Sequence, residues 1–248
     1  AFLALPALLP AADTWTPGEA WILRWSDEFS GTSVDPAKWT FDLGAGGWGN
    51  NELQTYTTTN ATVANGELTI EARRESNGSY TSSRLKTQGL ASWRYGKFAA
   101  RIRLPYGQGI WPAFWMLGDN ITTVGWPKCG EIDIMEMVGG GENRDDSIYG
   151  TLHWDANNSH ATYGSPAKEL PDPQLLRDDY HVFEVEWNSS VIIWRLDGVE
   201  FFRTSVDTAQ WPTMDEFHRD FFLILNLAVG GNWPGYPDGT TVFPQQMR

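Results

Sequence analysis

Three carboxylates lie close together in one short apolar segment of the chain. Within residues 129–138, only apolar residues separate Glu131, Asp133 and Glu136. Side chains of a β-strand alternate between its two faces, so Glu131 and Asp133 share a face. Glu136 falls out of phase unless the strand contains a β-bulge with one extra residue, for which Met135 is the simplest choice. With that bulge, all three carboxylates point the same way.

This spacing suits cleavage of a glycosidic bond through a covalent intermediate. Four strand steps of roughly 3.3 Å put the backbones of Glu131 and Glu136 about 13 Å apart. If the two side chains lean inward over Asp133, their carboxyl groups can reach the separation of roughly 5–5.5 Å that a double displacement needs. One glutamate must then be ionised while the other holds a proton, and Asp133 is placed to push their pKa values apart.

The alternative is a strand face that simply carries solvated acids. Residues 181–187 offer an example, because Glu184 and Glu186 alternate there with apolar residues and can face water. Three acids on one face are harder to explain in that way, since like charges repel each other and the bulge adds an irregularity. The spacing therefore favours catalysis.

Five further segments accompany the acidic motif in a fixed order. They are Trp25-Ser-Asp-Glu-Phe29, Trp48-Gly-Asn-Asn-Glu-Leu-Gln54, Gly109-Ile-Trp-Pro-Ala-Phe-Trp-Met-Leu-Gly118, Gly150-Thr-Leu-His-Trp154 and Asn226-Leu-Ala-Val-Gly-Gly-Asn-Trp-Pro-Gly235. Together with Glu-x-Asp-x-x-Glu they resemble the family 16 glycoside hydrolases, in the bulged form typical of laminarinases, which are endo-acting β-1,3-glucanases. The resemblance covers nearly the whole chain from about Trp25 onward.

The resemblance implies a role for each acid. Glu131 would be the nucleophile, Glu136 the general acid/base, and Asp133 the residue that steers charge and protons between them. It also implies that Asn51 and Arg84 bind sugars on the non-reducing side.

Further substrate contacts are expected from aromatic residues and one histidine. The chain has 14 Trp, and a Trp face suits the apolar patches of a pyranose ring. The family places Trp115 at the cleavage point, Trp233 in the neighbouring cleft and His153 near the acids. Position adds Trp111, which shares strand parity with Trp115, and Trp126, which lies just before the acidic strand. Without the motifs, Arg84 could be a surface cation and His153 a core histidine.

Short apolar stretches predict an all-β fold. They cover 67–72, 97–103, 191–196 and 221–227, and turn signals such as Asn65-Gly66 and Asp197-Gly198 separate them. This pattern predicts an antiparallel β-sandwich, which the resemblance refines to a concanavalin-like jelly roll with a concave substrate cleft. We expect residues 21–248 to form one catalytic domain, and only the segment 173–180 predicts a short helix.

Both ends of the chain carry expectations. Residues 1–12 resemble the apolar core and small-residue end of a secretory signal, so we expect residues 1–20 to be the remnant of a signal peptide and the protein to be secreted. Relatives continue beyond the segment matching 243–248 into a terminal strand. We therefore expect the domain to lack its final strand and to leave a sheet edge open.

Charge and cysteine content limit the partners. A net charge of −13 and a pI of about 4.6 make nucleic acid and anionic membranes poor partners. The resemblance implies β-glucan as the partner, and we expect a monomer. The lone Cys129 forms no intramolecular disulfide and no zinc cluster is present, so no catalytic cofactor is expected. Many family members hold a structural calcium, and Glu28 and Gly66 match its neighbourhood, although the missing strand would leave that site incomplete.

Two function classes remain open. The first is a retaining endo-β-1,3-glucanase, with mixed-linkage β-1,3-1,4-glucan, the lichenase substrate, as the second choice. The other is a glucan-binding protein without turnover on the same sandwich. The presence of Glu131, Asp133 and Glu136 favours the enzyme.

Exchange of the nucleophile separates these classes. Glu131→Gln should lower laminarin hydrolysis to less than about 1% of the wild-type rate while glucan binding persists, because the covalent step is lost but the aromatic cleft is not. Reducing-sugar release and affinity electrophoresis in laminarin gels measure the two properties. Hydrolysis above that level would remove Glu131 from the role of nucleophile.

Overall fold

The computed structural model describes residues 21–141 and 144–248, so the expected signal remnant at 1–20 lies outside the described residues. Helix within the described ranges is limited to α1 (Ile121–Val124) and the 3-10 turns Gly47–Gly49, Thr58–Asn60 and Asp215–His218. Helix α1 has only four residues, and among the described residues no helix is long and apolar enough to cross a membrane.

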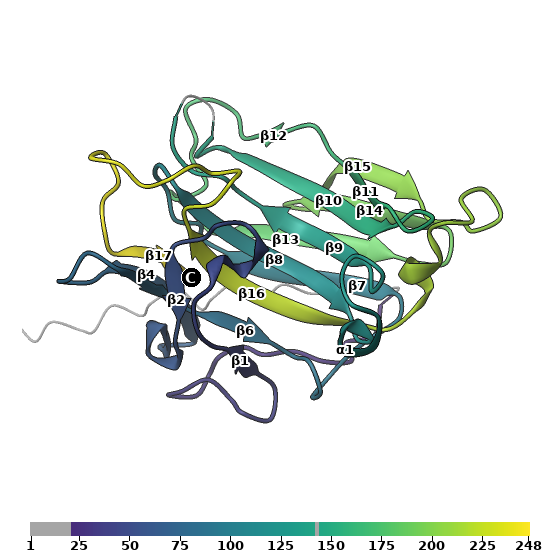
Figure 1. The fold of residues 1–248 in the computed structure, drawn as a ribbon, viewed down its shortest axis with the longest axis horizontal. Helices are drawn as coiled ribbons and strands as arrows, with labels where there is room; N and C mark the ends of the chain where they lie inside the picture. Colours follow the sequence, from purple (N-terminus) through teal and green to yellow (C-terminus); the bar gives the residue numbers. More distant parts are fainter. Residues whose placement is uncertain (1–20, 142–143) are drawn as a thin grey trace, which may run out of the picture.

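One large antiparallel sheet carries the acidic strand (Figure 1). Its order is β1-β6-β16-β8-β9-β10-β11, and β12 also pairs with β10. The bounds are β1 Thr40–Asp42, β6 Arg84–Lys86, β16 Phe221–Val229, β8 Ile110–Gly118, β9 Glu131–Glu136, β10 Ser147–Asp155, β11 His160–Gly164 and β12 Lys168–Glu169. Strand β9 is an interior strand, so its side chains are held by neighbours on both sides.

Two smaller sheets form the other layer. The first has the order β15-β14-β13-β7, and the second has the order β17-β4-β5-β2 with β3 paired to β4. The bounds are β15 Val199–Ser205, β14 Val191–Leu196, β13 His181–Trp187, β7 Gly96–Ile102, β17 Gln245–Met247, β4 Glu67–Arg74, β5 Tyr80–Ser82, β2 Gln54–Tyr56 and β3 Ala61–Ala64. The predicted antiparallel sandwich is confirmed, apart from one parallel pair between β2 and β5.

Strand β17 lies beside both smaller sheets. It pairs with β4, and Arg248 exchanges backbone hydrogen bonds with Arg103, at the end of β7, at N···O distances of 2.7 and 3.0 Å. Part of the edge that we expected to be open is therefore filled.

Large side chains fill the space between the layers. Trp187, Trp194, Phe183, Phe217 and Phe221 are among the largest fully buried side chains. They come from both layers, so the sequence alternation that predicted strands also supplies one continuous core.

The predicted bulge is present on β9. On β10, Tyr149 pairs with Glu136 and Thr151 pairs with Asp133, so the single residue Gly150 stands opposite two residues of β9. That two-to-one count defines a β-bulge, and it returns Glu136 to the face of Asp133.

The two residues inside the bulge are Ile134 and Met135, and both are buried in the core. On the other side of β9, Met135 keeps a partner in Phe114, and the register shift leaves Ile134 without one. The sequence had suggested Met135 as the extra residue. The position of the bulge is confirmed, and Ile134 is the residue that loses its partner on β8.

Trp194 of β14 anchors the bulge from the second layer. Its indole Nε1 donates to the carbonyl oxygen of Asp133 at 2.8 Å, in a buried environment. The same indole lies against Gly150, where a Cβ would come within 2.4 Å of Trp194 Cδ1. A glycine opposite the bulge is therefore required for the indole to reach β9.

Two sequence predictions are wrong. The segment 173–180 forms turns instead of a helix, because the backbone of Leu176 bonds to Asp145 on one side and Leu104 on the other. Glu184 does not face water: it is 2% exposed and ion-paired with Lys97 at 2.9 Å and with Arg195 at 3.3 Å.

The indole that anchors the bulge can be tested against a matched tryptophan. Trp194→Phe and Trp187→Phe each remove one buried N–H donor, the latter from Phe217, so each should lower the free energy of unfolding by about 1–3 kcal/mol. Only Trp194→Phe should also lower kcat, by about tenfold, because the catalytic strand shifts. Urea unfolding and laminarin kinetics measure both effects, and equal kcat losses in the two variants would contradict the anchoring role.

Candidate active site

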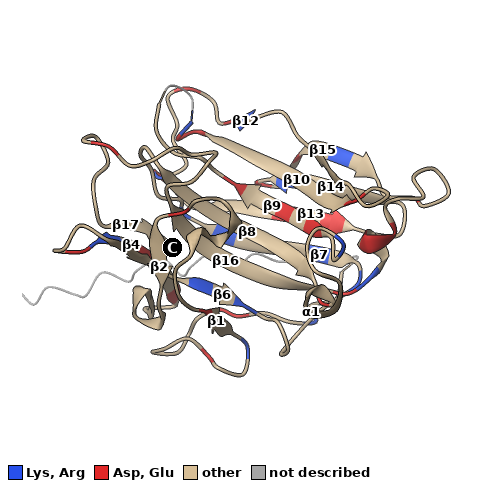
Figure 2. Ribbon diagram, in the orientation of Figure 1, with Lys and Arg blue, Asp and Glu red and all other residues tan. Residues whose placement is uncertain are grey.

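Each of the two glutamates of β9 accepts a hydrogen bond from its own tryptophan. Trp126 Nε1 donates to Glu131 Oε2 at 2.9 Å, and Trp111 Nε1 donates to Glu136 Oε1 at 3.1 Å. The two indoles come from different segments, the loop before β9 and strand β8. Figure 2 shows acidic positions on β9, an interior strand of the main sheet. The two N–H donors set the orientation of the glutamate side chains that β9 carries.

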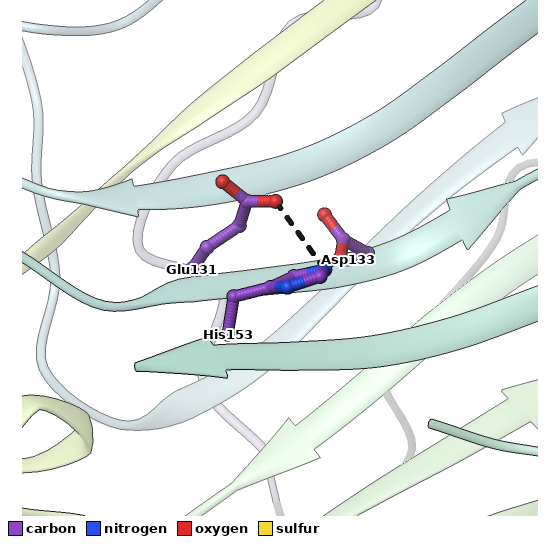
Figure 3. Close-up of side chains that lie close together, drawn as sticks. All are labelled: Glu131, Asp133 and His153. Atoms are coloured by element: carbon purple, nitrogen blue, oxygen red, sulfur yellow. Dashed lines mark ion pairs between the residues drawn. The ribbon is translucent and has the colours of Figure 1, made fainter. Parts of the chain in front are cut away.

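His153 of β10 closes the acidic cluster from the next strand (Figure 3). Its Nε2 lies 3.4 Å from Asp133 Oδ2 and 3.7 Å from Glu131 Oε1. Asp133 is 2% exposed, and its Oδ2 makes no hydrogen bond with the described residues. His153 therefore lies beside the acids, with Nε2 facing that buried oxygen.

Burial raises the pKa of all three acids. Desolvation, with the Asp133 charge second, raises the pKa of Glu131 to about 8, while His153, Trp126 and Arg84 oppose this rise. Desolvation also raises the pKa of Asp133 to about 8. For Glu136, desolvation and the charges of both other acids hold the pKa well above its usual value. The charges of two acids act on Glu136 and the charge of one acts on Glu131, which favours the proton on Glu136, as a general acid requires.

Arg84 and Trp115 form a second cluster beside the acids. The Arg84 guanidinium carbon lies 4.7 Å from the Trp115 ring centre and 5.2 Å from that of Trp48, and Arg84 Nε lies 3.0 Å from Asp42 Oδ2. Trp115 Nε1 donates to Asn226 Oδ1 at 2.7 Å. Arg84 is therefore a positioned cation in the site and not an ordinary surface charge.

The remaining predicted residues join loops at the rim of the site. Asn51 has a positive φ of 58° and donates through Nδ2 to Asn232 Oδ1 at 2.8 Å. The neighbouring Trp233 is 39% exposed and packs edge-on against Trp111 and Tyr149, at 5.8 and 5.1 Å between ring centres. The predicted substrate-binding residues thus lie on or near strands β8 and β9, where they contact the acids, one another or the neighbouring loops.

The structure adds polar residues that sequence reasoning missed. Asn226 lies in β16, receives the Trp115 N–H and donates to Tyr56 Oη at 3.1 Å. The sequence did contain a sign of this role, because Asn226 is the one polar residue among the nine of β16. His160, at the start of β11, lies 2.9 Å from His153 between ring nitrogens. No sequence pattern marked His160, since the contact forms only when β10 and β11 pair.

The cluster of Glu131, Asp133 and His153 could also suggest a metal, because one ligand atom of each lies within 4.8 Å of the others. Its groups are already engaged with one another and with the N–H of Trp126, which donates to Glu131. We therefore assign these groups to proton chemistry.

Cys129, just before β9, is fully buried, and burial raises the pKa of its thiol to about 11.

The fold and the paired glutamates define a glycosidase, and the comparisons agree. Residues 49–243 match the model of the glycosyl hydrolases family 16, so the chain belongs to that family and is a glycoside hydrolase. The hydrolases of this family need no catalytic cofactor.

Relatives cover nearly the whole chain. A beta-glucanase of Rhodothermus marinus is 43% identical over 245 residues, covering 92% of this chain and 82% of that protein. The catalytic domain of an endo-1,3-beta-glucanase (laminarinase) from Thermotoga petrophila has a TM-score of 0.83 at 45% identity, covering 92% of this chain and 94% of that one. The clotting factor G alpha subunit of Tachypleus tridentatus is 41% identical over 232 residues, covering 92% of this chain but only 33% of the relative.

The charge of Asp133 should set the pH range of activity. Asp133 raises the pKa of both glutamates, so Asp133→Asn should make both easier to ionise and move both limbs of the pH–rate profile to lower pH, by about one unit or more. As a control, Glu216→Gln removes another buried carboxyl, whose pKa burial raises to about 7, and should leave both limbs in place. Unmoved limbs in Asp133→Asn would show that Asp133 does not tune the glutamates.

Proposed function

We propose that this protein is an endo-acting β-1,3-glucanase that hydrolyses laminarin-type glucan with retention of configuration. The observation that carries the proposal is the bulged strand that puts Glu131, Asp133 and Glu136 on one face, with each glutamate held by a separate indole N–H. The relatives support the substrate, because they are named beta-glucanase and laminarinase.

The first half of the reaction forms a covalent intermediate. The Glu131 carboxylate attacks the anomeric carbon while Glu136 gives its proton to the glycosidic oxygen. The bond from that carbon to the leaving oxygen breaks, and its electron pair goes to the oxygen as the oxygen takes the proton. The product is an ester between the sugar and Glu131.

The second half releases the sugar. Glu136, now a carboxylate, takes a proton from water as the water oxygen attacks the anomeric carbon, and the ester bond electrons return to Glu131. Two inversions give net retention. When Glu131 is esterified its charge is gone, so one of the causes that raise the pKa of Glu136 disappears at the step in which Glu136 must be a base.

Two other functions are less well supported. Mixed-linkage β-1,3-1,4-glucan is a second substrate for the same chemistry, and the contacts of the acids do not distinguish the linkages. A glucan-binding protein without turnover would have no use for three buried carboxylates with raised pKa values, since unpaired buried charge is costly.

The setting of the enzyme is also part of the proposal. We infer a secreted monomer, whose negative charge attracts neither nucleic acid nor anionic membranes. A structural calcium near Glu28 and Gly66 stays a prediction with little support, because both residues are exposed and Glu28 belongs to no group of three acidic, histidine or cysteine ligands among the described residues. Calcium wants six or more oxygens.

Chemical rescue tests the mechanism. Glu136→Ala should lose most laminarin hydrolysis. On an aryl β-1,3-glucoside whose leaving group departs without a proton, the glycosyl-enzyme still forms, and azide should raise the rate by attacking it without needing a base. The product should be a glycosyl azide of β-configuration, which NMR identifies. An α-azide or no azide product would refute the retaining mechanism, and parallel digests of laminarin and lichenan with the wild-type enzyme show which linkage is preferred.

A further inference from the structure

His160 contacts the far side of the residues that surround the nucleophile. Its Nε2 lies 2.9 Å from His153 Nδ1, and the two rings are stacked with centres 5.1 Å apart and planes at 20°. The centre of its ring is also 4.6 Å from that of Trp126. His153 and Trp126 both contact Glu131, so His160 reaches the nucleophile through two neighbours without touching it.

A contact of 2.9 Å between two imidazole nitrogens needs one proton between them. Two lone pairs would repel each other, and so would two N–H groups. If His160 Nε2–H donates, then neutral His153 carries its own proton on Nε2, which is the nitrogen that faces Asp133 and Glu131. If His153 donates instead, a neutral ring turns a lone pair toward those oxygens, which is unfavourable once either carboxyl is ionised, as the nucleophile must be.

His160 can also hydrogen-bond to His153 after His153 takes up a second proton. An imidazolium has N–H groups on both nitrogens, so His153 Nδ1 becomes a donor, and His160 can change tautomer and accept. In both states His153 keeps Nε2–H toward the acids. That matters because Asp133 Oδ2 is buried and makes no hydrogen bond with the described residues, so the N–H of His153 at 3.4 Å is the donor that faces it.

We propose that His160 is a positioning residue, which fixes the tautomer and orientation of His153 so that an N–H faces Glu131 and Asp133 throughout the reaction. Four groups act on His153: Glu131 and Asp133 on β9, the charge of Glu136 on the same strand, and His160 on β11. Nothing in the family match or the names of the relatives assigns this role.

The proposal predicts how the nucleophile responds when His160 is lost. The His153 charge lowers the pKa of Glu131, and an oriented N–H favours the carboxylate in the same direction. Without His160, Nδ1 has only water as a partner and His153 is free to adopt either tautomer. The pKa of Glu131 then rises, and the acidic limb of the pH dependence of kcat/KM moves to higher pH.

Two substitutions at His160 separate hydrogen bonding from shape. His160→Phe keeps an aromatic ring beside Trp126 but removes both nitrogens, whereas His160→Gln keeps a donor and an acceptor. His160 is exposed on an edge strand, so both variants should fold. His181→Gln is the matched control, because His181 bonds to Asp197 at 2.8 Å and lies on β13 in the other layer.

The primary measurement is the ring ¹⁵N spectrum of the four histidines. His153 should show the Nε2–H tautomer in the wild type, in His160→Gln and in His181→Gln, and a mixture of tautomers in His160→Phe. In laminarin assays, kcat/KM of His160→Phe should fall about 2- to 10-fold and its acidic limb should rise by roughly 0.3–1 pH unit, the effect of one hydrogen bond. The kcat/KM of His160→Gln should stay within about twofold of the wild-type value, because glutamine can still make the hydrogen bond to His153.

Two results would overturn the proposal: an unchanged His153 tautomer and acidic limb in His160→Phe, or equal impairment of His160→Gln and His160→Phe. The inference rests on the proposed function only for its kinetic readout. If the wild-type protein hydrolysed no glucan but the His153 tautomer still depended on His160, the proposed function would fail and the positioning role would stand.

Discussion

The buried hydrogen bond from Trp194 to the Asp133 carbonyl is the interaction on which the active site depends. It ties the catalytic strand to the opposite layer at the point where the ladder is irregular. Gly150 leaves room for the indole, and the bulge returns Glu136 to the cleft face. The core of the sandwich therefore does more than stabilise the fold, because it also fixes which face each acid occupies.

Burying three carboxyl groups side by side on β9 lowers the stability of the folded protein once they ionise. A carboxyl whose pKa is higher in the folded than in the unfolded chain favours folding most when it is protonated. Its contribution is therefore present at low pH and is lost as pH rises from the ordinary carboxyl range toward about 8, where Glu131 and Asp133 ionise. The fully buried aromatic core, with Trp187 and Trp194 at its centre, offsets that loss. The same burial that costs stability raises the pKa of both Glu131 and Glu136.

Local patterns predicted much of this structure. Strand alternation and the phase of Glu136 located the bulge, and Asn65-Gly66 forms the expected two-residue hairpin turn, with positive φ at both residues. The failures depended on partners distant in sequence. Glu184 is buried because two cations from neighbouring strands cover it, and nothing near His160 indicates that its ring will meet that of His153. Periodicity shows which face a residue occupies, but it does not show what that face will touch.

Trp126 connects two properties that are usually treated separately. It is 48% exposed, so its ring is available to a sugar, while its N–H holds an oxygen of the nucleophile. Any substrate that moves this indole also changes the proton affinity of Glu131, and thermodynamic linkage requires the reverse to hold equally. Glucan affinity and nucleophile ionisation are therefore reciprocal in this enzyme, and the acidity of the medium acts on recognition as well as on bond cleavage.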